Sequence, residues 1–184
     1  AIAPAFKVHK GPPMVNSISM ERNRLDTMLS LVADTDMKVI ALCMRDGEMP
    51  ETAEQRLQIA DELVTALTGK NVPVENIYVD PLVQSIGTRD DYGIEFLNAI
   101  ERIRAEFPGI HTMCGLSNIS YGLPNRKFAN HTFMVMAITK GLDGAIVNPK
   151  DKTMMGSIVA AETLIGRDTY CENYLDAYRE GLFG

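Results

Sequence analysis

Short apolar segments alternate with amphipathic helical segments along the whole chain, and this alternation limits the possible folds more than any other feature. The strand-like segments are brief, continuous and apolar, as strands are when a parallel sheet is buried on both faces. Gly11 and Gly69 are expected helix stops, and Thr52 is an expected helix N-cap. The predicted strands lie within residues 12–19, 37–44, 72–81, 110–118 and 142–149. The predicted helices lie within residues 1–10, 20–36, 50–69, 89–109, 125–141, 151–164 and 168–179.

Two architectures accommodate a repeated strand–helix order of this kind: an open, doubly wound sheet and part of an eight-stranded barrel. Strand–helix–strand connections form right-handed crossovers, so the strands are expected to run parallel. A dinucleotide-binding fold has no support, because no Gly-x-Gly-x-x-Gly motif follows any predicted strand. The Thr-Gly-Lys at 68–70 is not a phosphate loop either, because Val64 stands where that motif needs its first glycine.

The composition predicts a single globular domain spanning residues 1–184. The formal net charge of -6 argues against nucleic acid or an anionic membrane surface as the main partner. No apolar run approaches the roughly 20 residues that span a bilayer. The cysteines are far apart and odd in number, so we expect reduced thiols in a cytoplasmic protein, with no disulfide framework or zinc pair. They are Cys43, Cys114 and Cys171.

Polar side chains recur where the predicted strands end. Asn16, Asp80 and Asn118 each stand at the carboxyl end of a predicted strand, and Asn148 falls just past another. In parallel α/β folds this edge of the sheet is where ligands bind. Asparagine and aspartate also start loops and cap helices, which would explain any one of them alone. Three of them at strand ends favour a binding site at this edge.

The chemistry of these side chains suits a flat heterocycle with donors and acceptors along its edge. A carboxylate can accept hydrogen bonds from an amino group and an adjacent ring N–H, and a carboxamide can donate and accept in one plane. The set lacks a nearby histidine for a hydrolase triad, and carboxamides are weak metal ligands. We expect packing or surface roles for the three histidines, which are His9, His111 and His131.

Four segments resemble the methyltetrahydrofolate:corrinoid-protein methyltransferases. These belong to the pterin-binding barrel superfamily, with dihydropteroate synthase and the folate domain of cobalamin-dependent methionine synthase. The segments are MVNSIS, YVDPL, GLSNISYGLPNR and TFMVMAITKGLDGAIVNP, at residues 14–19, 78–82, 115–126 and 132–149. The resemblance covers nearly the whole chain. It implies an α/β fold, a TIM (β/α)8-type barrel of which this N-terminally truncated chain holds only about the fourth to eighth strands.

The resemblance also implies roles for three of the polar residues. Asp80 would accept hydrogen bonds from the pterin amino group and ring N–H. Asn16 would bond another part of the pterin edge. Asn118 would be both substrate-binding and catalytic, because it would reach N5, the nitrogen that carries the methyl group.

Further residues are placed beside the pterin by the same resemblance. Gly115 and Ser117 would shape the wall next to the ring, or serve close strand packing and the loop start. Arg126 would meet a polar part of the substrate, or simply begin a helix. Tyr121 stands where some relatives carry another polar residue. Relatives have one more pterin-binding aspartate on a strand that this chain lacks, so we expect the isolated chain to be poorly active.

The implied activity is methyl transfer between N5 of methyltetrahydrofolate and the cobalt of a corrinoid (cobalamin) carried by a partner protein. The folate is then a substrate, and no metal is expected on this chain. Homodimers are common among relatives, whereas no nucleic-acid or membrane partner is expected. Two alternatives stay open. One is a non-catalytic barrel fragment that binds a pterin or a partner; the other is dihydropteroate synthase, which would want a lysine where this chain has GLSN.

Overall fold

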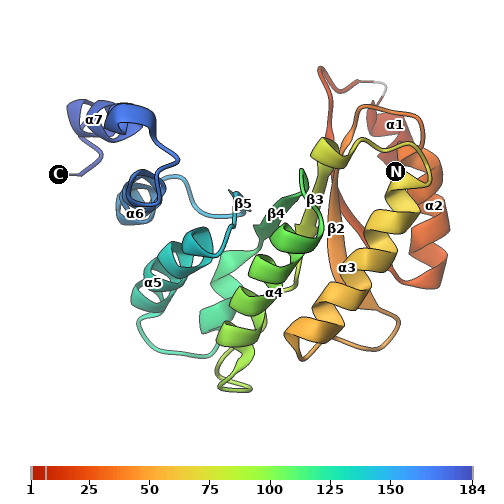
Figure 1. The fold of residues 1–184 in the computed structure, drawn as a ribbon, viewed down its shortest axis with the longest axis horizontal. Coiled ribbons are helices and arrows are strands. Elements are labelled where there is room, and N and C mark those ends of the chain that lie inside the picture. The colour runs from red at the N-terminus through yellow and green to blue at the C-terminus, as the bar shows by residue number, and fades with distance from the viewer. Residues whose placement is uncertain (1, 7, 184) are drawn as a thin grey trace.

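In the computed structural model, which describes residues 2–6 and 8–183, helices and strands alternate as the sequence predicts (Figure 1). The strands are β1 (Met14–Met20), β2 (Lys38–Arg45), β3 (Ile77–Asp80), β4 (His111–Cys114) and β5 (Gly144–Ala145). The α-helices are α1 (Ile2–Phe6), α2 (Arg22–Val32), α3 (Ala53–Thr68), α4 (Tyr92–Glu106), α5 (Arg126–Thr139), α6 (Lys152–Leu164) and α7 (Glu172–Arg179). Short 3-10 helices are η1 (Val74–Asn76), η2 (Leu116–Ser120) and η3 (Thr169–Cys171).

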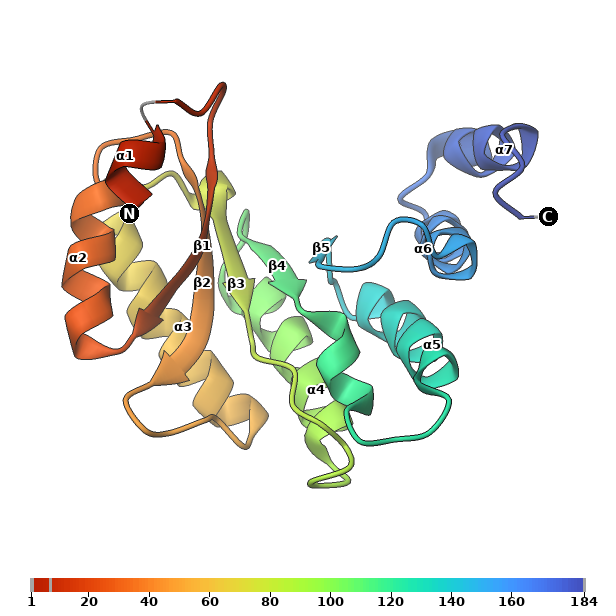
Figure 2. The ribbon, with the colours of Figure 1, turned by 180° about the vertical axis from the view of Figure 1, so that it is seen from behind.

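The described strands form one parallel sheet in the order β1-β2-β3-β4-β5. Figure 2 shows the strands in front of α3 and α4, so these crossover helices lie on the same face of the sheet. A doubly wound sheet would carry helices on both faces, whereas a barrel wall carries them on its outside. Strand order equal to chain order, with crossover helices on one side, is therefore the arrangement of a barrel wall.

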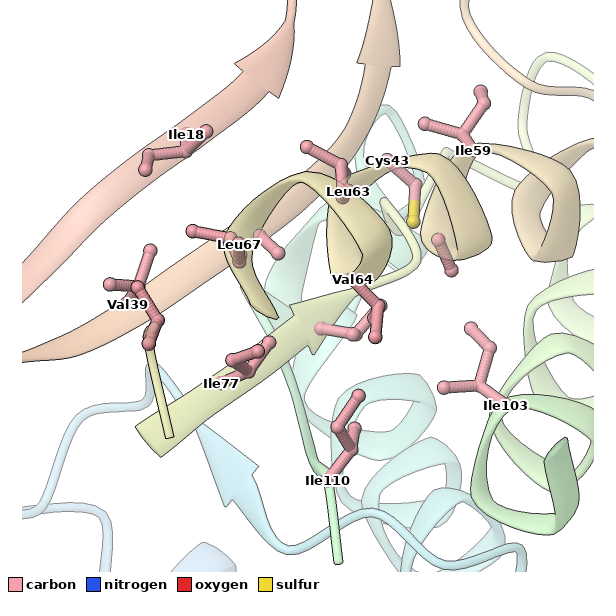
Figure 3. Close-up of a cluster of buried hydrophobic side chains, with 14 of the residues drawn as sticks. Ile18, Val39, Cys43, Ile59, Leu63, Val64, Leu67, Ile77, Ile103 and Ile110 are labelled. Carbon is pink, nitrogen blue, oxygen red and sulfur yellow. The ribbon is translucent and has the colours of Figure 1, made fainter. Parts of the chain in front are cut away.

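The main core lies between the sheet and helices α2, α3 and α4. In Figure 3, Leu67 of α3 lies near Val39 and Ile77 of the sheet, and Ile59 lies nearer Cys43. Burying a side chain of this kind stabilises the fold by about 1.5–3 kcal/mol. A second cluster joins α4, η2 and α5 beside β4. It includes Phe96, Ile100, Leu116, Phe133 and Met134.

Helix α3 begins and ends where the sequence predicts. The Thr52 hydroxyl accepts a hydrogen bond from the Gln55 N–H at 3.2 Å, and the Gln55 side chain accepts one from the Thr52 N–H at 3.1 Å. This reciprocal pair is a capping box, which satisfies donors that a helix start would leave unpaired. Gly69 is the C-cap. The predicted cap and stop are both confirmed.

The predicted end of the first strand is wrong. β1 continues to Met20, so Asn16 lies inside the strand. The strand continues because Ile18 is fully buried and keeps β1 paired with β2. The predicted N-terminal helix is also too long, since α1 ends at Phe6. Residues 1 and 7 lie outside the described part of the chain.

The fourth strand is shorter than predicted. β4 ends at Cys114, because Gly115 (φ -80, ψ 83) leads the chain into the 3-10 helix η2. Asn118 therefore lies in a turn that follows the strand. The helix after it, α5, begins after Asn125 as predicted, but Asn125 is left-handed (φ 47) and makes no side-chain cap. The polar residues after β4 therefore predicted where the chain turns, but not the backbone conformation of the turn.

Candidate functional site

Asp80 and Asn118 lie at neighbouring strand ends on the carboxyl edge of the sheet. Asp80 is the last residue of β3, and Asn118 lies in η2, just after the adjacent strand β4. Gly115 contacts both. Its backbone hydrogen-bonds the Asp80 carboxylate, and a β-carbon built on it would lie 3.9 Å from Nδ2 of Asn118. The turn thus brings both the carboxylate and the carboxamide close to one glycine.

The carboxylate of Asp80 is buried and held by the backbone. Only 9% of the residue is exposed, and its Oδ1 accepts a hydrogen bond from the Leu82 N–H at 2.9 Å. Burial raises the pKa of Asp80 from 3.8 to about 6, against the opposing effect of the hydrogen bonds from Leu82 and Gly115. At neutral pH the group is a poorly solvated anion. It therefore favours a ligand that brings N–H donors of its own.

Asn118, in contrast, has an exposed side chain. Its main chain is held on both sides: the N–H donates to the Gly115 carbonyl at 3.4 Å, and the carbonyl accepts from the Tyr121 N–H at 3.1 Å. The turn therefore fixes where the side chain begins while leaving the carboxamide at the solvent edge. A ligand anchored on Asp80 would meet this carboxamide on its exposed side.

Arg126 holds the η2 turn in place. Its Nη2 donates to the Ser117 carbonyl at 2.5 Å, and its Nε donates to Oγ of Ser120 at 3.0 Å. The Ser120 hydroxyl donates in turn to Oδ1 of Asn130 at 2.7 Å. The guanidinium carbon also lies 5.9 Å from the centre of the Tyr121 ring. The structure therefore directs Arg126 toward the protein's own turn, and its contact with a substrate stays a prediction.

Replacing Arg126 with methionine is expected to lower the free energy of unfolding by about 1 kcal/mol, because it removes two hydrogen bonds to η2. Urea denaturation measures the change. Lys127→Met is the matched control, since Lys127 is 79% exposed and lies 3.9 Å from its partner Asp151. That control is expected to change the stability by less than about 0.5 kcal/mol. Equal losses in the two variants would contradict a bracing role for Arg126.

Ser117 shares a pocket of about 330 Å³ with Asn148. The pocket is lined by residues of η2, α5, the segment that follows β5 and the start of α6. Oδ1 of Asn148 accepts a hydrogen bond from the Lys150 N–H at 3.0 Å, so this residue organises the loop that leads to α6. The loop-forming role that any single strand-end asparagine can have is therefore present at Asn148.

Asn16 lies on the same sheet face as Asp80 but further from the carboxyl edge of the sheet. It pairs with Ile40 of β2, whereas Asp80 pairs with Leu42, two residues further along. Because side chains alternate along a strand, these positions share a face, opposite to that of Cys43. The β1–β2 register shifts just after Asn16. The structure thus brings Asn16 to the correct face without placing it at the strand end.

Two of the histidines have partners within the fold. The His111 ring stacks on Tyr78 with centroids 4.5 Å apart. Nε2 of His131 lies 3.3 Å from Oδ2 of Asp151, the N-cap of α6. His9 is exposed. These positions agree with the packing and surface roles expected from the sequence.

The cysteines and acidic residues form no metal cluster among residues 2–6 and 8–183, where no three His, Cys, Asp or Glu side chains come together. Cys43 and Cys114 are buried, and burial raises the pKa of both thiols, so they stay neutral. Cys171 is exposed. Over the same residues, no helix combines the length and the apolar character needed to cross a membrane.

Comparison with known protein families identifies the family of the chain. The family described as pterin binding enzyme matches residues 2–148. The chain belongs to the pterin-binding enzyme family. The match includes β1 to β5, and with them Asp80, Gly115 and Asn118.

Individual members of the pterin-binding family match most of the chain. The methylcorrinoid:tetrahydrofolate methyltransferase of Eubacterium limosum is 36% identical over 181 residues, which are 97% of this chain and 67% of that protein. The methionine synthase of Mycobacterium tuberculosis is 29% identical over 176 residues, 89% of this chain and 15% of that protein. A structure of Xanthomonas albilineans dihydropteroate synthase with 4-aminobenzoic acid matches with a TM-score of 0.68 at 17% identity, covering 90% of this chain and 64% of that one.

These similarities confirm the predicted superfamily and the predicted fold, part of a pterin-binding barrel. They also confirm the predicted enzyme class at the level of the relatives, because the Eubacterium protein is named as a methyltransferase. The chain spans about two thirds of the Eubacterium protein and of the Xanthomonas chain. Which barrel strands it holds stays a prediction.

Two groups near Asp80 in this member of the pterin-binding enzyme family were not predicted from the sequence. One is the Leu82 N–H, a backbone donor that no side-chain pattern reveals. The other is Arg56 of α3, which is fully buried and donates to the Pro81 carbonyl at 2.9 Å. A signal for Arg56 exists, since it lies at helical spacing from buried Ile59 and so on the apolar stripe of α3.

Proposed function

We propose that this member of the pterin-binding family moves a methyl group between N5 of methyltetrahydrofolate and the cobalt of a corrinoid on a partner protein. One observation carries the proposal: a buried carboxylate, Asp80, and an exposed carboxamide, Asn118, both lie close to Gly115. A buried acceptor suits the amino and ring N–H groups of a pterin. An exposed carboxamide suits the edge of the ring that must also face a second protein.

The proposed roles follow from these positions. Asp80 anchors the pterin through its amino group and ring N–H. Asn16, on the same sheet face, contacts another part of the ring edge, and Gly115 and Ser117 line the wall beside it. The absence of a side chain on Gly115 matters here, because any β-carbon would fill space next to the Asn118 carboxamide.

Methyl transfer from the folate requires the N5–CH3 bond to break with its electron pair left on N5, which takes up a proton. The methyl group accepts the electron pair of cobalt(I), which the partner's corrinoid supplies. In this proposal Asn118 hydrogen-bonds N5 and stabilises the charge that develops there. An interaction that is stronger in the transition state than with the bound substrate accelerates the chemical step. The exposed position of Asn118 leaves room for the corrinoid to approach.

Titration calorimetry of the full chain with methyltetrahydrofolate tests the proposal, and binding with a 1:1 ratio is the expected result. The Asn16→Ala, Asp80→Ala double variant is the control and is expected to show no binding. Transfer of the methyl group to free cob(I)alamin, followed by absorbance, then tests the chemistry. Binding without transfer would favour the non-catalytic alternative. A folded chain that shows no binding at all would contradict the proposal.

Four broader predictions belong with this function. The corrinoid protein would dock on the carboxyl edge of the sheet, because Asn118 is exposed there. The protein would act in the cytoplasm. Residues 1–184 would form a single domain. A homodimer, as in the family it resembles, would be the assembly measured by sedimentation.

A further inference from the structure

Arg56 is a fully buried arginine in the first turn of α3. Arginine is almost never fully buried unless it is paired, because removing its charge from water is costly. Here no carboxylate lies within ion-pair distance of it in the described part of the chain. The burial of the Arg56 charge therefore needs an explanation other than an ion pair.

The guanidinium has one identified partner among the described residues. Its Nε donates to the carbonyl of Pro81 at 2.9 Å, whereas Nη1 and Nη2 are buried without a hydrogen bond there. Burial lowers the pKa of Arg56, and the nearby Glu95 carboxylate acts in the opposite direction. The side chain thus crosses from α3 to the end of β3 for a single backbone contact.

That contact falls on the segment that presents the Asp80 carboxylate. Pro81 separates Asp80 from Leu82, whose N–H donates to Asp80 Oδ1 at 2.9 Å. Leu82 has a left-handed backbone (φ 65), a conformation that is unfavourable for a residue with a side chain. Proline has no N–H of its own, so its carbonyl is the only hydrogen-bonding group through which this residue can be held. The Arg56 bond therefore secures the turn at its centre.

We propose that Arg56 is a positioning residue for the substrate site, which holds the Asp80–Leu82 turn so that the carboxylate is presented in a fixed direction. The inference rests on the proposed pterin-binding role of Asp80. It assigns no contact between Arg56 and the substrate. The guanidinium acts through the Pro81 carbonyl, from the helix side of the sheet.

Arg56→Met tests this role, because methionine keeps much of the apolar volume and removes every donor. Arg56→Lys is the second variant, since it keeps the charge and one flexible donor group. Arg102→Met is the matched control: Arg102 links α4 to Glu54 of α3 at 2.6 Å on the surface. Each protein is measured for its melting temperature, its affinity for methyltetrahydrofolate and the pH titration of the Asp80 carboxyl carbon by NMR. The Asp80→Asn variant assigns that signal.

The titration separates positioning from simple stabilisation. If the turn loosens, the Leu82 hydrogen bond weakens, and the pKa of Asp80 rises further because that bond favours the ionised form. The other titratable groups near the carboxylate are the Cys43 and Cys114 thiols on the flanking strands, with Arg56 behind Cys43. Burial keeps both thiols neutral through the range in which Asp80 titrates, so they do not mask the change.

We expect Arg56→Met to weaken methyltetrahydrofolate binding by about tenfold or more and to raise the Asp80 titration midpoint. Arg56→Lys is expected to fall between it and wild type, and Arg102→Met to match wild type. Wild-type affinity and an unmoved midpoint in a destabilised Arg56→Met would overturn the inference. If wild type itself fails to bind the folate, the proposed function fails, and the midpoint in the free proteins still decides the role of Arg56. If Arg56→Met does not fold, Arg56→Lys decides it by the same two readouts.

Discussion

Replacing Asp80 with asparagine is expected to make the protein more stable at neutral pH while abolishing pterin binding. The two effects have one cause. In the folded chain the carboxylate is buried, and burial raises its pKa from 3.8 to about 6. Above that pH the protein holds a poorly solvated charge, which weakens the fold and at the same time attracts the donors of a pterin. Asparagine removes the charge and therefore both consequences.

The sign of the effect follows from proton linkage. Below about pH 4 the carboxyl group is protonated in both the folded and the unfolded chain, so no penalty is present. Between about pH 4 and 6 the unfolded chain loses its proton first, and wild-type stability falls as the pH rises through this window. Above it the full penalty remains, about 3 kcal/mol for a shift of roughly two pKa units. The advantage of Asp80→Asn is therefore expected to be about 2–3 kcal/mol at neutral pH and to vanish below about pH 4.

Urea denaturation of wild type and Asp80→Asn at several pH values measures this difference, and calorimetry measures the lost affinity. Asp61→Asn is the matched control, because Asp61 lies on the exposed side of α3 and its carboxylate pays no burial cost. A variant that is less stable than wild type at neutral pH would show that the backbone hydrogen bonds of Asp80 outweigh its burial. A variant that still binds the folate tightly would remove Asp80 from the site.

Replacing Asn118 with alanine is expected to slow methyl transfer by about 10²–10³-fold while leaving the fold intact. The side chain is exposed, so its loss should change the free energy of unfolding by less than about 0.5 kcal/mol. Substrate affinity should fall far less than the transfer rate. That pattern distinguishes a group that acts on the developing charge at N5 from one that only binds the ring.

Single-turnover transfer from methyltetrahydrofolate to cob(I)alamin gives the rate, and calorimetry gives the affinity of the same preparation. Asn98→Ala provides the comparison, because it removes a carboxamide from helix α4. Its transfer rate is expected to equal that of wild type. A full transfer rate in Asn118→Ala would remove this residue from the chemistry, whereas equal losses of rate and affinity would assign it to binding alone.

Much of the fold could be predicted from the sequence because it is encoded locally. Periodicity located the described strands and crossover helices, and Thr52 marked the start of α3 as its N-cap. Strand ends were less predictable, because they depend on packing between segments. Asn16 reads as a strand end, yet the burial of Ile18 carries β1 four residues further to Met20.

In the candidate site, too, residue types could be predicted from the sequence, whereas features that depend on packing could not. Residue types and order indicated Asp80 and Asn118, because several carboxylates and carboxamides at strand ends together favour a binding site. The sequence did not reveal that one would be buried and the other exposed, because burial depends on the whole sheet. Arg56 was missed because a charged residue near a helix start normally reads as surface, although its spacing places it on the apolar stripe.

In the proposed function, the contrast between Asp80 and Asn118 separates the group that recognises the substrate from the group that acts on it. Asp80 is buried at the end of β3, near the buried thiols of Cys43 and Cys114. Asn118 stands on an exposed turn, where a side chain can be exchanged without repacking anything. In a fold of this kind, substitutions on the exposed turn can change the reaction while the buried residue that would hold the ring stays the same.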